Sequence, residues 1–510
     1  MKSDDDFAEL EAENTYLKQK VQLLEEQLRL ARHQRFGASS EQMKLIGGEQ
    51  LGLFNEAEKS ADASLPEPDI EQAVPRRRKQ KGKREKDFSG LPVEQIIYDL
   101  SESECIYPDC GGSMHTCGHK VARRELTVIP AQYKVTEHLE TAYSCRHCEQ
   151  NGDKTPMKTS KAPAPVIKNS GICSPSLLAQ VLYNKYALAL PLYRQEADMK
   201  HMGIHVSRQN MANWVVYSSE HYFSLIFKLM RDELLKNDIL HADETSVQVL
   251  REDGKLAASK SYMWLYRTGA AAKCPAVLFE YQASRGAEHP RHFLAGFRGY
   301  LHTDGYASYH DIENVTAVGC WTHMRRKFAD VLKTLDSDIR MDSPAQTGLD
   351  FCNRLFALEG KHENLSAEER NKRRNELSRP IADAFFAWAK EEFDKCRVPE
   401  SALGKALIYA CNQKPWLMNV FLDGRLELSN NRAENAIRPF TLGRKNWLFS
   451  NTPAGAKASA MVYSIIETAK ANGLRPFEYL KFLLERLPQG IALEDCLPWR
   501  EAAQQLCRES

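Results

Sequence analysis

Two aspartates within strand-like segments of alternating sequence constrain the fold of this chain most. Residues 238–250 read DILHADETSVQVL, which predicts a strand with Asp243 near its middle. Residues 259–268 and 276–282 predict two further strands, so that the three form an antiparallel meander. PRHFLAGF then predicts a helix, and GYLHTDGYASY predicts a fourth strand that ends at Asp304.

A short fifth strand, TAVGC, and a helix over WTHMRRKFADVL follow. This order of three meandering strands, a crossover helix, a fourth strand, a short strand and a helix is that of an RNase H-like fold. We therefore predict a multidomain α/β protein whose RNase H-like core is a mixed five-stranded sheet with helices. In that sheet the strands of Asp243 and Asp304 are neighbours.

A third carboxylate is expected from a later helix. LSNNRAENAIRPF predicts a helix that is capped by Ser429 or Asn430, carries Glu434 and ends near Pro439. The preceding residues 331–425 read mostly as helix, so we predict a helical insertion before the final helix of the core.

The three carboxylates suit a metal site. Neighbouring carboxylates repel each other unless a cation neutralises them, and Mg²⁺ takes carboxylate oxygens readily. Two such ions about 4 Å apart can activate an attacking oxygen and stabilise a leaving one. Asp243, Asp304 and Glu434 are therefore candidate catalytic residues and ligands of two Mg²⁺ (or Mn²⁺) ions, although any single one could be a solvated surface charge. Basic residues that would attract a polyanion to Glu434 are Arg432, Arg438, Arg444 and Lys445.

A cysteine-rich stretch precedes this region. Its four thiolates, in two knuckles, suit tetrahedral structural zinc and come from Cys105, Cys110, Cys145 and Cys148. Residues 125–145 alternate and predict a hairpin that joins the knuckles. The alternative is a set of reduced cysteines on a β-rich module without metal. Because the first knuckle is wide, substitute ligands are considered: His115, Cys117, His119 and His147.

The amino-terminal region predicts self-association. Residues 7–31 carry a heptad pattern with Asn14 at an a position, which favours a parallel homodimer over a lone amphipathic helix. Residues 56–90 predict a charged linker. Its basic run, RRRKQKGKREK, either contacts phosphates or is a solvated spacer.

Helices are predicted over residues 174–217, with Gly203 ending one helix and Ser207 capping the next. This pattern fits a helix-turn-helix, and also a plain αα-hairpin. The side chains that a helix-turn-helix would offer to a DNA groove are those of Ser207, Arg208, Gln209, Asn210 and Asn213.

Four more side chains are candidates for contact with nucleic acid. His323, Arg325 and Arg326 either steady a phosphate or are ordinary helix-surface groups. Trp447 either stacks on an unpaired base or belongs to the core.

Composition narrows the class of protein. The net charge of +1 gives no indication of a partner, and the 13 cysteines favour metal binding over a disulfide framework. No apolar run reaches the roughly 18 residues of a membrane span, and MKSDDDFAEL lacks a signal segment. We expect no membrane partner and a cytoplasmic location.

Long motifs carry a resemblance to a known family. HADETSVQVL, LHTDGYASYH, GCWTHMRRKFADV and LSNNRAENAIRPFTLGRKNWLFSNTPAGAKASAMVYSIIETAKANGLRPFEYL resemble the large transposase of the insertion-sequence-66 family. LARHQRFGASSEQ, the cysteine module and the helices before Asp243 resemble it in the same order. The resemblance implies DDE chemistry at Asp243, Asp304 and Glu434, and a zinc finger whose first gap is wider than in the family.

The domains that we expect are a coiled coil over 1–45, a charged linker over 46–92, a zinc-finger-like module over 93–160, a helix-turn-helix region over 161–232, a catalytic domain over 233–450 and a carboxy-terminal helical domain over 451–510.

The implied activity is that of a DNA transposase. Water frees a 3′-OH at the element end, and that 3′-OH attacks a target phosphodiester, so no protein nucleophile is needed. The expected partners are double-stranded DNA (terminal inverted repeats and target), a second copy of the chain, and accessory proteins of the same element. The expected location is the bacterial cytosol, on the nucleoid when DNA is bound. The alternatives are an inactive DNA-binding remnant or regulator, and an RNase H-type nuclease without strand transfer.

Overall fold

The structure, a computed structural model, describes residues 14, 20–21, 24–25, 93–97, 120–121, 132–144, 157–168, 170–396 and 398–508. The chain divides into two units, residues 1–48 with 164–509, and residues 49–163 with 510. Among the described helices, none is both long enough and apolar enough to cross a membrane.

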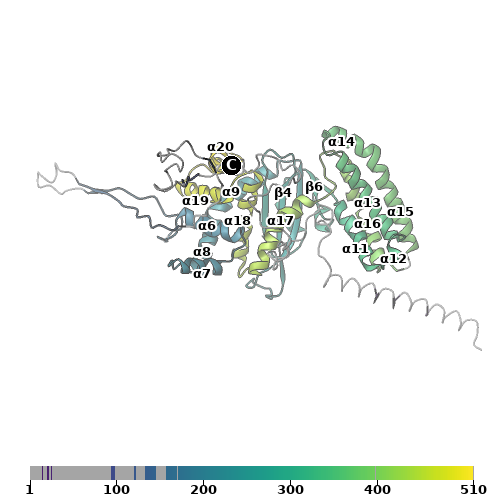
Figure 1. Ribbon diagram of the computed structural model, residues 1–510, viewed down its shortest axis with the longest axis horizontal. Coiled ribbons are helices and arrows are strands. Elements are labelled where there is room, and N and C mark those ends of the chain that lie inside the picture. Colours follow the sequence, from purple (N-terminus) through teal and green to yellow (C-terminus); the bar gives the residue numbers. More distant parts are fainter. Residues whose placement is uncertain are drawn as a thin grey trace, which may run out of the picture. The chain divides into compact units, whose positions relative to one another are not determined.

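A five-stranded mixed sheet forms the centre of the larger unit (Figure 1), with the strand order β5-β4-β3-β6-β7. The strands are β3 Ile239–Gln248, β4 Lys260–Thr268, β5 Val277–Gln282, β6 Gly299–His302 and β7 Val315–Val318. β3, β4 and β5 pair antiparallel, whereas β6 is parallel to both β3 and β7. The predicted meander and mixed sheet are confirmed, and the RNase H-like class stays a prediction.

The fourth strand is shorter than predicted. It ends at His302, two residues before Asp304. The physical reason is the turn that follows, because Gly305 has a φ of +93° and the Tyr306 N–H donates to Asp304 Oδ1 at 2.9 Å. Asp304 therefore lies in the turn immediately after β6. The preceding helix, α10, is Glu288–Phe293, displaced slightly toward the amino terminus from its predicted position.

One group of helices shares a hydrophobic core with the sheet. The amino-terminal members are α6 Pro175–Tyr186, α7 Leu192–His201, α8 Arg208–Ser218 and α9 Ser224–Leu234. A π-helical turn, Ser219–Phe223, joins α8 to α9. The carboxy-terminal members are α18 Pro453–Ala471, α19 Pro476–Arg486 and α20 Glu501–Cys507.

Helix α18 covers the edge strand β5. Ser464 Oγ accepts the Phe279 N–H at 2.8 Å, and Thr468 Oγ1 accepts the Val277 N–H at 3.0 Å. Four residues of a helix rise about 6 Å, and two residues of a strand about 6.7 Å, so the two repeats match. The hydroxyls thus satisfy backbone groups that would otherwise be open to another strand.

A second group of helices lies between β7 and α17, where a helical segment was expected, and has its own apolar core. Its members form a bundle in Figure 1 and are α11 Trp321–Thr334, α12 Ser337–Arg340, α13 Pro344–Lys361, α14 Ala367–Arg373, α15 Arg379–Lys395 and α16 Ala402–Leu417. A π-helical turn, Arg374–Ser378, joins α14 to α15.

Helix α17, Asn431–Trp447, crosses a face of the sheet (Figure 1). The prediction that this helix ends near Pro439 is wrong. A proline inside a helix costs about 3 kcal/mol, but the apolar face continues past it. The residues that this face buries are Ala433, Ala436, Ile437, Phe440 and Gly443.

Several predictions about the amino-terminal half lie outside the described residues. These are most of the coiled coil over 7–31, the linker over 56–90 and the proposed zinc ligands Cys105, Cys110, Cys145 and Cys148, with their substitutes. The residues that are described in the coiled-coil segment are helical and exposed, and are Asn14, Lys20, Val21, Leu24 and Glu25.

In the smaller unit, β1 Ala142–Tyr143 pairs antiparallel with β2 Lys158–Thr159. This pairing differs from the hairpin expected over 125–145. Within the described part of that segment the only strand is 142–143, and its partner follows the second cysteine pair. The pairing therefore brackets the chain that carries Cys145 and Cys148.

A buried carboxyl on β5 gives the first prediction. Glu280 Oε2 is buried without a hydrogen-bond partner among the described residues, and burial raises the pKa of Glu280 to about 7. The Glu280 carboxyl therefore stays protonated in the folded chain above pH 4.5, where an exposed glutamate ionises. The stabilisation that this protonated carboxyl contributes to the folded state is fully present below about pH 4.5, and it is lost as the pH rises through 7.

We expect Glu280→Gln, which cannot ionise, to remove this pH dependence. Between pH 4.5 and 8 the native chain should lose on the order of 2 kcal/mol relative to the variant, measured by urea unfolding. The exposed substitution Glu494→Gln is the control for the loss of one charge. Equal pH profiles for the native chain and Glu280→Gln would show that the carboxyl is ionised in the folded state.

Candidate active site

Parallel pairing of β3 with β6 brings the two predicted aspartates to the same end of the sheet. The register pairs Leu240 with Leu301 and His241 with His302. Each aspartate, Asp243 or Asp304, lies two residues beyond its paired histidine. The prediction that these two strands are neighbours is therefore confirmed.

Asn430 attaches the helix of Glu434 to the strand of Asp243. It occupies the predicted N-cap position of α17, but its side chain makes no cap bond and points to β3 instead. Its Nδ2 donates to the Ala242 carbonyl at 2.8 Å, and its Oδ1 is 3.0 Å from His241 Nδ1. Asn430 is fully buried, and Glu434 follows in the first helical turn.

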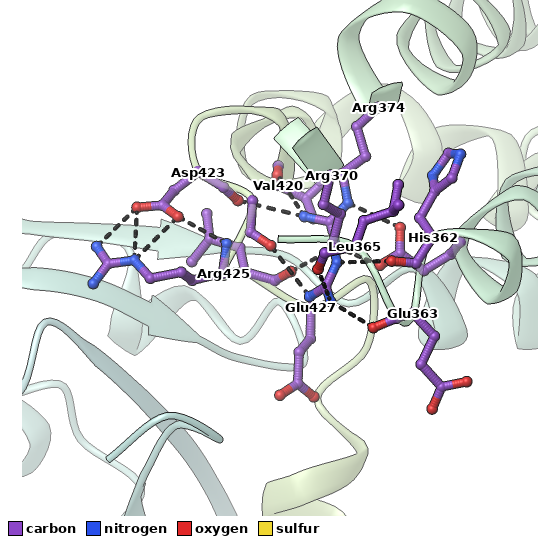
Figure 2. A network of polar contacts seen from close by, with 12 residues as sticks. His362, Glu363, Leu365, Arg370, Arg374, Val420, Asp423, Arg425 and Glu427 are labelled. Carbon is purple, nitrogen blue, oxygen red and sulfur yellow. Dashed lines mark hydrogen bonds and ion pairs between the residues drawn. The ribbon is translucent and has the colours of Figure 1, made fainter. Parts of the chain in front are cut away.

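The chain that leads into α17 is braced by a buried arginine of the helical bundle (Figure 2). Arg374 is 1% exposed and donates to the Leu426 carbonyl at 2.7 Å and the Asp423 carbonyl at 3.4 Å. Its guanidinium is ion-paired with Glu359. Arg425 pairs with Asp423 at 2.8 Å, and also with Asp238, beside the start of β3, at 2.9 Å.

Further hydrogen bonds hold the chain that leads into α17 and the turn after β6. The Trp321 N–H donates to the Leu428 carbonyl at 2.8 Å, and the Glu427 N–H donates to His302 Nε2 at 3.4 Å. Burial lowers the pKa of His302 to about 3, so that its ring is neutral and can accept this bond. Helix α16 holds the turn after β6, because Tyr409 OH donates to the Asp304 carbonyl at 2.9 Å.

The carboxyl groups lie close enough to disfavour the ionisation of Asp243. Burial, and then the charges of Glu244, Asp304 and Glu434, hold the pKa of Asp243 well above its usual range. Glu434 Oε1 is buried without a hydrogen-bond partner among the described residues. Its carboxylate is 3.5 Å from Arg326 Nη2, and Oε1 is 3.6 Å from His323 Nδ1. Mutually repelling oxygens with one unsatisfied atom fit a hard divalent cation.

An open cavity of about 330 Å³ exposes part of this cluster. It is lined by the two acids Asp243 and Glu434, by the bases His323, Arg326 and Arg438, and by Ile437 and Thr441. Acids beside arginines give the cavity the means to hold a cation and an anion together, which is the requirement of a metal-assisted reaction at phosphate.

Glu244 is a buried acidic residue that the sequence reasoning missed. Tyr309 OH donates to its carboxylate at 2.6 Å, Arg285 is ion-paired with it, and its side chain is 1% exposed. Neighbouring residues of a strand face opposite sides of the sheet, so Glu244 and Asp243 point in different directions. The signal available in the sequence was the pair of consecutive acids near the middle of a predicted strand.

The predicted basic residues have different environments. Arg326 and Arg438 line the cavity. Arg325 instead donates to Asn353 of α13 at 2.8 Å. Lys445 is exposed.

Two further arginines of α17 have partners within the chain. Arg432 is ion-paired with Glu427. Arg444 bonds to β3 through the Ser246 carbonyl and, at 3.2 Å, Thr245 Oγ1. Arg432 and Arg444 therefore secure the position of α17.

Trp447 is half-buried and packs against the core. Its ring centroid lies 6.2 Å from that of Tyr186 and 6.5 Å from that of Tyr463. Lys185 Nζ lies 5.6 Å from the centroid of the indole. These contacts favour the core alternative over base stacking.

The predicted boundaries between α7 and α8 are confirmed. Gly203 has a φ of +78°, and the Ile204 N–H reaches back to the Met199 carbonyl at 2.9 Å, which ends α7. Ser207 Oγ accepts the Asn210 N–H at 3.2 Å and caps α8. The exposed side chains at the start of α8 are those of Ser207, Arg208, Gln209 and Asn210. Their contact with DNA stays a prediction.

The fold and site define an α/β protein with a carboxylate-rich site on a mixed sheet. Comparison with known families identifies the family to which the chain belongs. Residues 170–458 match the model of the transposase IS66 family, and residues 464–499 match the IS66 C-terminal element. Residues 104–149 match the zinc-finger binding domain of transposase IS66, and residues 23–96 match the model described as transposase C of IS166 homeodomain. The chain belongs to the IS66 transposase family.

Relatives from Sinorhizobium fredii extend over most of the chain. One of them, uncharacterized protein y4qI, is 28% identical over 97% of this chain and 92% of its own length. Uncharacterized protein y4hP is 28% identical over 95% of this chain and 88% of its own length. The similarity therefore includes the segments that hold both Asp243 and Glu434.

The buried amide of Asn430 gives the second prediction. Asn430→Ala leaves the Ala242 carbonyl and His241 without this partner, so we expect a loss of about 1–3 kcal/mol in the free energy of unfolding. Hydrogen exchange should also accelerate in the first turn of α17. Asn472→Ala is the matched control, because Asn472 donates to the Pro275 carbonyl at 2.7 Å, away from α17. Unchanged exchange in Asn430→Ala would show that other contacts hold the helix.

Proposed function

We propose that this chain is an active DNA transposase that cuts and rejoins strands by a two-metal reaction at Asp243, Asp304 and Glu434. The observation that carries the proposal is that Asp243 and Glu434 line one cavity, while the parallel register of β3 and β6 brings Asp304 to the same end of the sheet. These residues are far apart in the sequence, and they act on one another electrostatically in the fold. Membership of a transposase family supports DNA as the substrate.

The three carboxylates would hold Mg²⁺ or Mn²⁺. When bound, two such ions lower the pKa of the attacking hydroxyl and neutralise charge on the leaving oxygen. The chain orients the ligands before they bind. Asp243 Oδ1 accepts the Glu244 N–H at 2.8 Å, and Asp304 Oδ1 accepts the Tyr306 N–H at 2.9 Å. One backbone bond to each carboxylate limits the rotation of that side chain.

Arg326 and Arg438 line the cavity and would bind the non-bridging oxygens of the scissile phosphate. In the first reaction water displaces the 3′ oxygen at the element end and frees a 3′-OH. In the second, that 3′-OH attacks a target phosphodiester, and one P–O bond forms as another breaks. Both reactions are in-line displacements at phosphorus, so one set of residues serves both.

DNA recognition is proposed for other parts of the chain. The start of α8 would meet the terminal repeats, and its exposed polar side chains support this role. The zinc-finger segment over 104–149 supports DNA binding through the family to which it belongs. Homodimerisation through residues 7–31 would let one complex hold two element ends, and accessory proteins of the element are further partners to test.

Neutral substitutions in the triad give the third prediction. We expect Asp243→Asn, Asp304→Asn and Glu434→Gln each to lower cleavage of labelled element ends in Mg²⁺ by at least about a thousandfold. The exposed substitution Asp253→Asn is the control and should cleave at the native rate. Thermal unfolding of each variant checks the fold. Native-like cleavage by any triad variant contradicts the assignment.

The same reactions separate a transposase from a nuclease. The native chain should yield products in which the element end is joined to target DNA. Cleavage without any joined product, at all target concentrations, would favour the RNase H-type nuclease. Absence of both products with intact DNA binding would favour an inactive DNA-binding remnant.

DNA contact by α8 gives the fourth prediction. Arg208→Ala should weaken binding to terminal-repeat DNA, and the slope of log affinity against log salt should fall by about 1 if the contact is to phosphate. Lys390→Ala on α15 is the control for the loss of an exposed cation. Unchanged affinity and slope in Arg208→Ala would remove this end of α8 from the DNA interface.

A further inference from the structure

We propose a second metal site beside the triad, in which Cys320, His323 and Glu434 bind a thiophilic divalent cation such as Zn²⁺. Because Glu434 would belong to both sites, zinc would compete with the Mg²⁺ of the triad. The binding itself does not depend on the proposed function, and only the inhibitory consequence rests on it.

The geometry supports a shared ion. One ligand atom from each of these residues (a thiol sulfur, an imidazole nitrogen and a carboxylate oxygen) lies within 4.8 Å of the other two. His323 Nδ1 and Glu434 Oε1 are 3.6 Å apart. With Zn–N and Zn–O bonds of about 2.1 Å, two ligands of a tetrahedral zinc ion lie about 3.4 Å apart. The observed separation thus needs little change.

Two of the three ligand atoms have no other partner. His323 Nδ1 and Glu434 Oε1 are both buried, and neither makes a hydrogen bond within the described part of the chain. Buried polar atoms of this kind are uncommon in folded proteins because each loses its bonds to water. These two atoms face each other across a gap too long for a hydrogen bond, and a cation between them would satisfy both.

The sulfur of Cys320 lies where the start of α11 meets the start of α17. Cys320 occupies the N-cap position of α11, and its Sγ accepts the Asn430 N–H at 3.2 Å. Burial raises the pKa of this thiol to about 11. A metal ion deprotonates a thiol that coordinates it, so a bound cation would offset the effect of burial.

The donor set selects the class of ion. Sulfur, nitrogen and oxygen ligands are typical of zinc, and three protein ligands leave a fourth position open. Mg²⁺ prefers oxygen alone and takes sulfur poorly. The cavity that Glu434 and His323 line is open, so an ion has a path to the site. Zinc bound here would use the Glu434 carboxylate, which the triad then lacks.

Titration of the purified full-length chain with Co²⁺ tests the site, because cobalt bound to thiolate absorbs light and reports zinc sites. Cys320→Ser is the informative variant, since serine keeps an acceptor for the Asn430 N–H and is a favoured residue at a helix N-cap, so the fold is preserved. Cys352→Ser is the matched control, because Cys352 is also buried but lies in α13. The difference between variants removes the contribution of other cysteines.

We expect Cys320→Ser to bind one fewer Co²⁺ ion with thiolate absorption than the native chain, and Cys352→Ser to match the native chain. His323→Ala should bind that ion at least about tenfold more weakly. Equal stoichiometry and absorption in the native chain and Cys320→Ser would overturn the site. A loss that is equal in Cys352→Ser and Cys320→Ser would overturn it as well.

Inhibition is measured separately. The Zn²⁺ concentration that halves Mg²⁺-dependent cleavage should rise at least about tenfold in Cys320→Ser, whatever the rate of that variant without zinc. An unchanged concentration would overturn the competition. The cobalt titration needs no cleavage, so failure of the triad assignment leaves it readable. Conversely, a chain that does not bind cobalt at Cys320 leaves the triad untouched.

Discussion

Asn430 is fully buried between β3 and the start of α17, and its amide bonds to both His241 and Ala242. A buried amide is stable only when its donors and acceptors are satisfied, so these bonds allow little freedom in how the helix meets the strand. The constraint matters because Asp243 follows Ala242 directly and Glu434 lies one turn into the helix. The relative position of these two carboxylates depends on this contact.

The helical bundle stabilises the same contact from a distance. Arg374 donates hydrogen bonds to backbone carbonyls of the chain before α17, and the Trp321 N–H donates to the Leu428 carbonyl. Tyr409 of the bundle also binds the carbonyl of Asp304. An apolar core holds the bundle together, and these polar bonds connect it to the turn of Asp304 and to the chain that leads into the helix of Glu434. The insertion can therefore be understood as a support for the site as well as a separate layer of helices.

Much of the sheet could be predicted from sequence because its strands alternate and are bounded by glycines. The turn from α7 to α8 could also be predicted, because Gly203 favours a positive φ after a helix and Ser207 favours an N-cap position. Pro439 was misinterpreted because local propensity opposes a helix there, whereas burial of Ile437 and Phe440 outweighs it. Glu244 was missed since its partners, Tyr309 and Arg285, are distant in sequence. For the same reason the sequence could not separate Arg326 and Arg438, which line the cavity, from Arg444, which is bonded to β3.

The central claim is that Asp243, Asp304 and Glu434 share metal ions that act on DNA. Anomalous diffraction from crystals of the chain with element-end DNA and Mn²⁺ tests it most directly. We expect manganese bound by oxygens of all three carboxylates and in contact with the phosphate at the element end. Manganese bound elsewhere, or a site in which one of the three carboxyl groups points away from the metal, would contradict it.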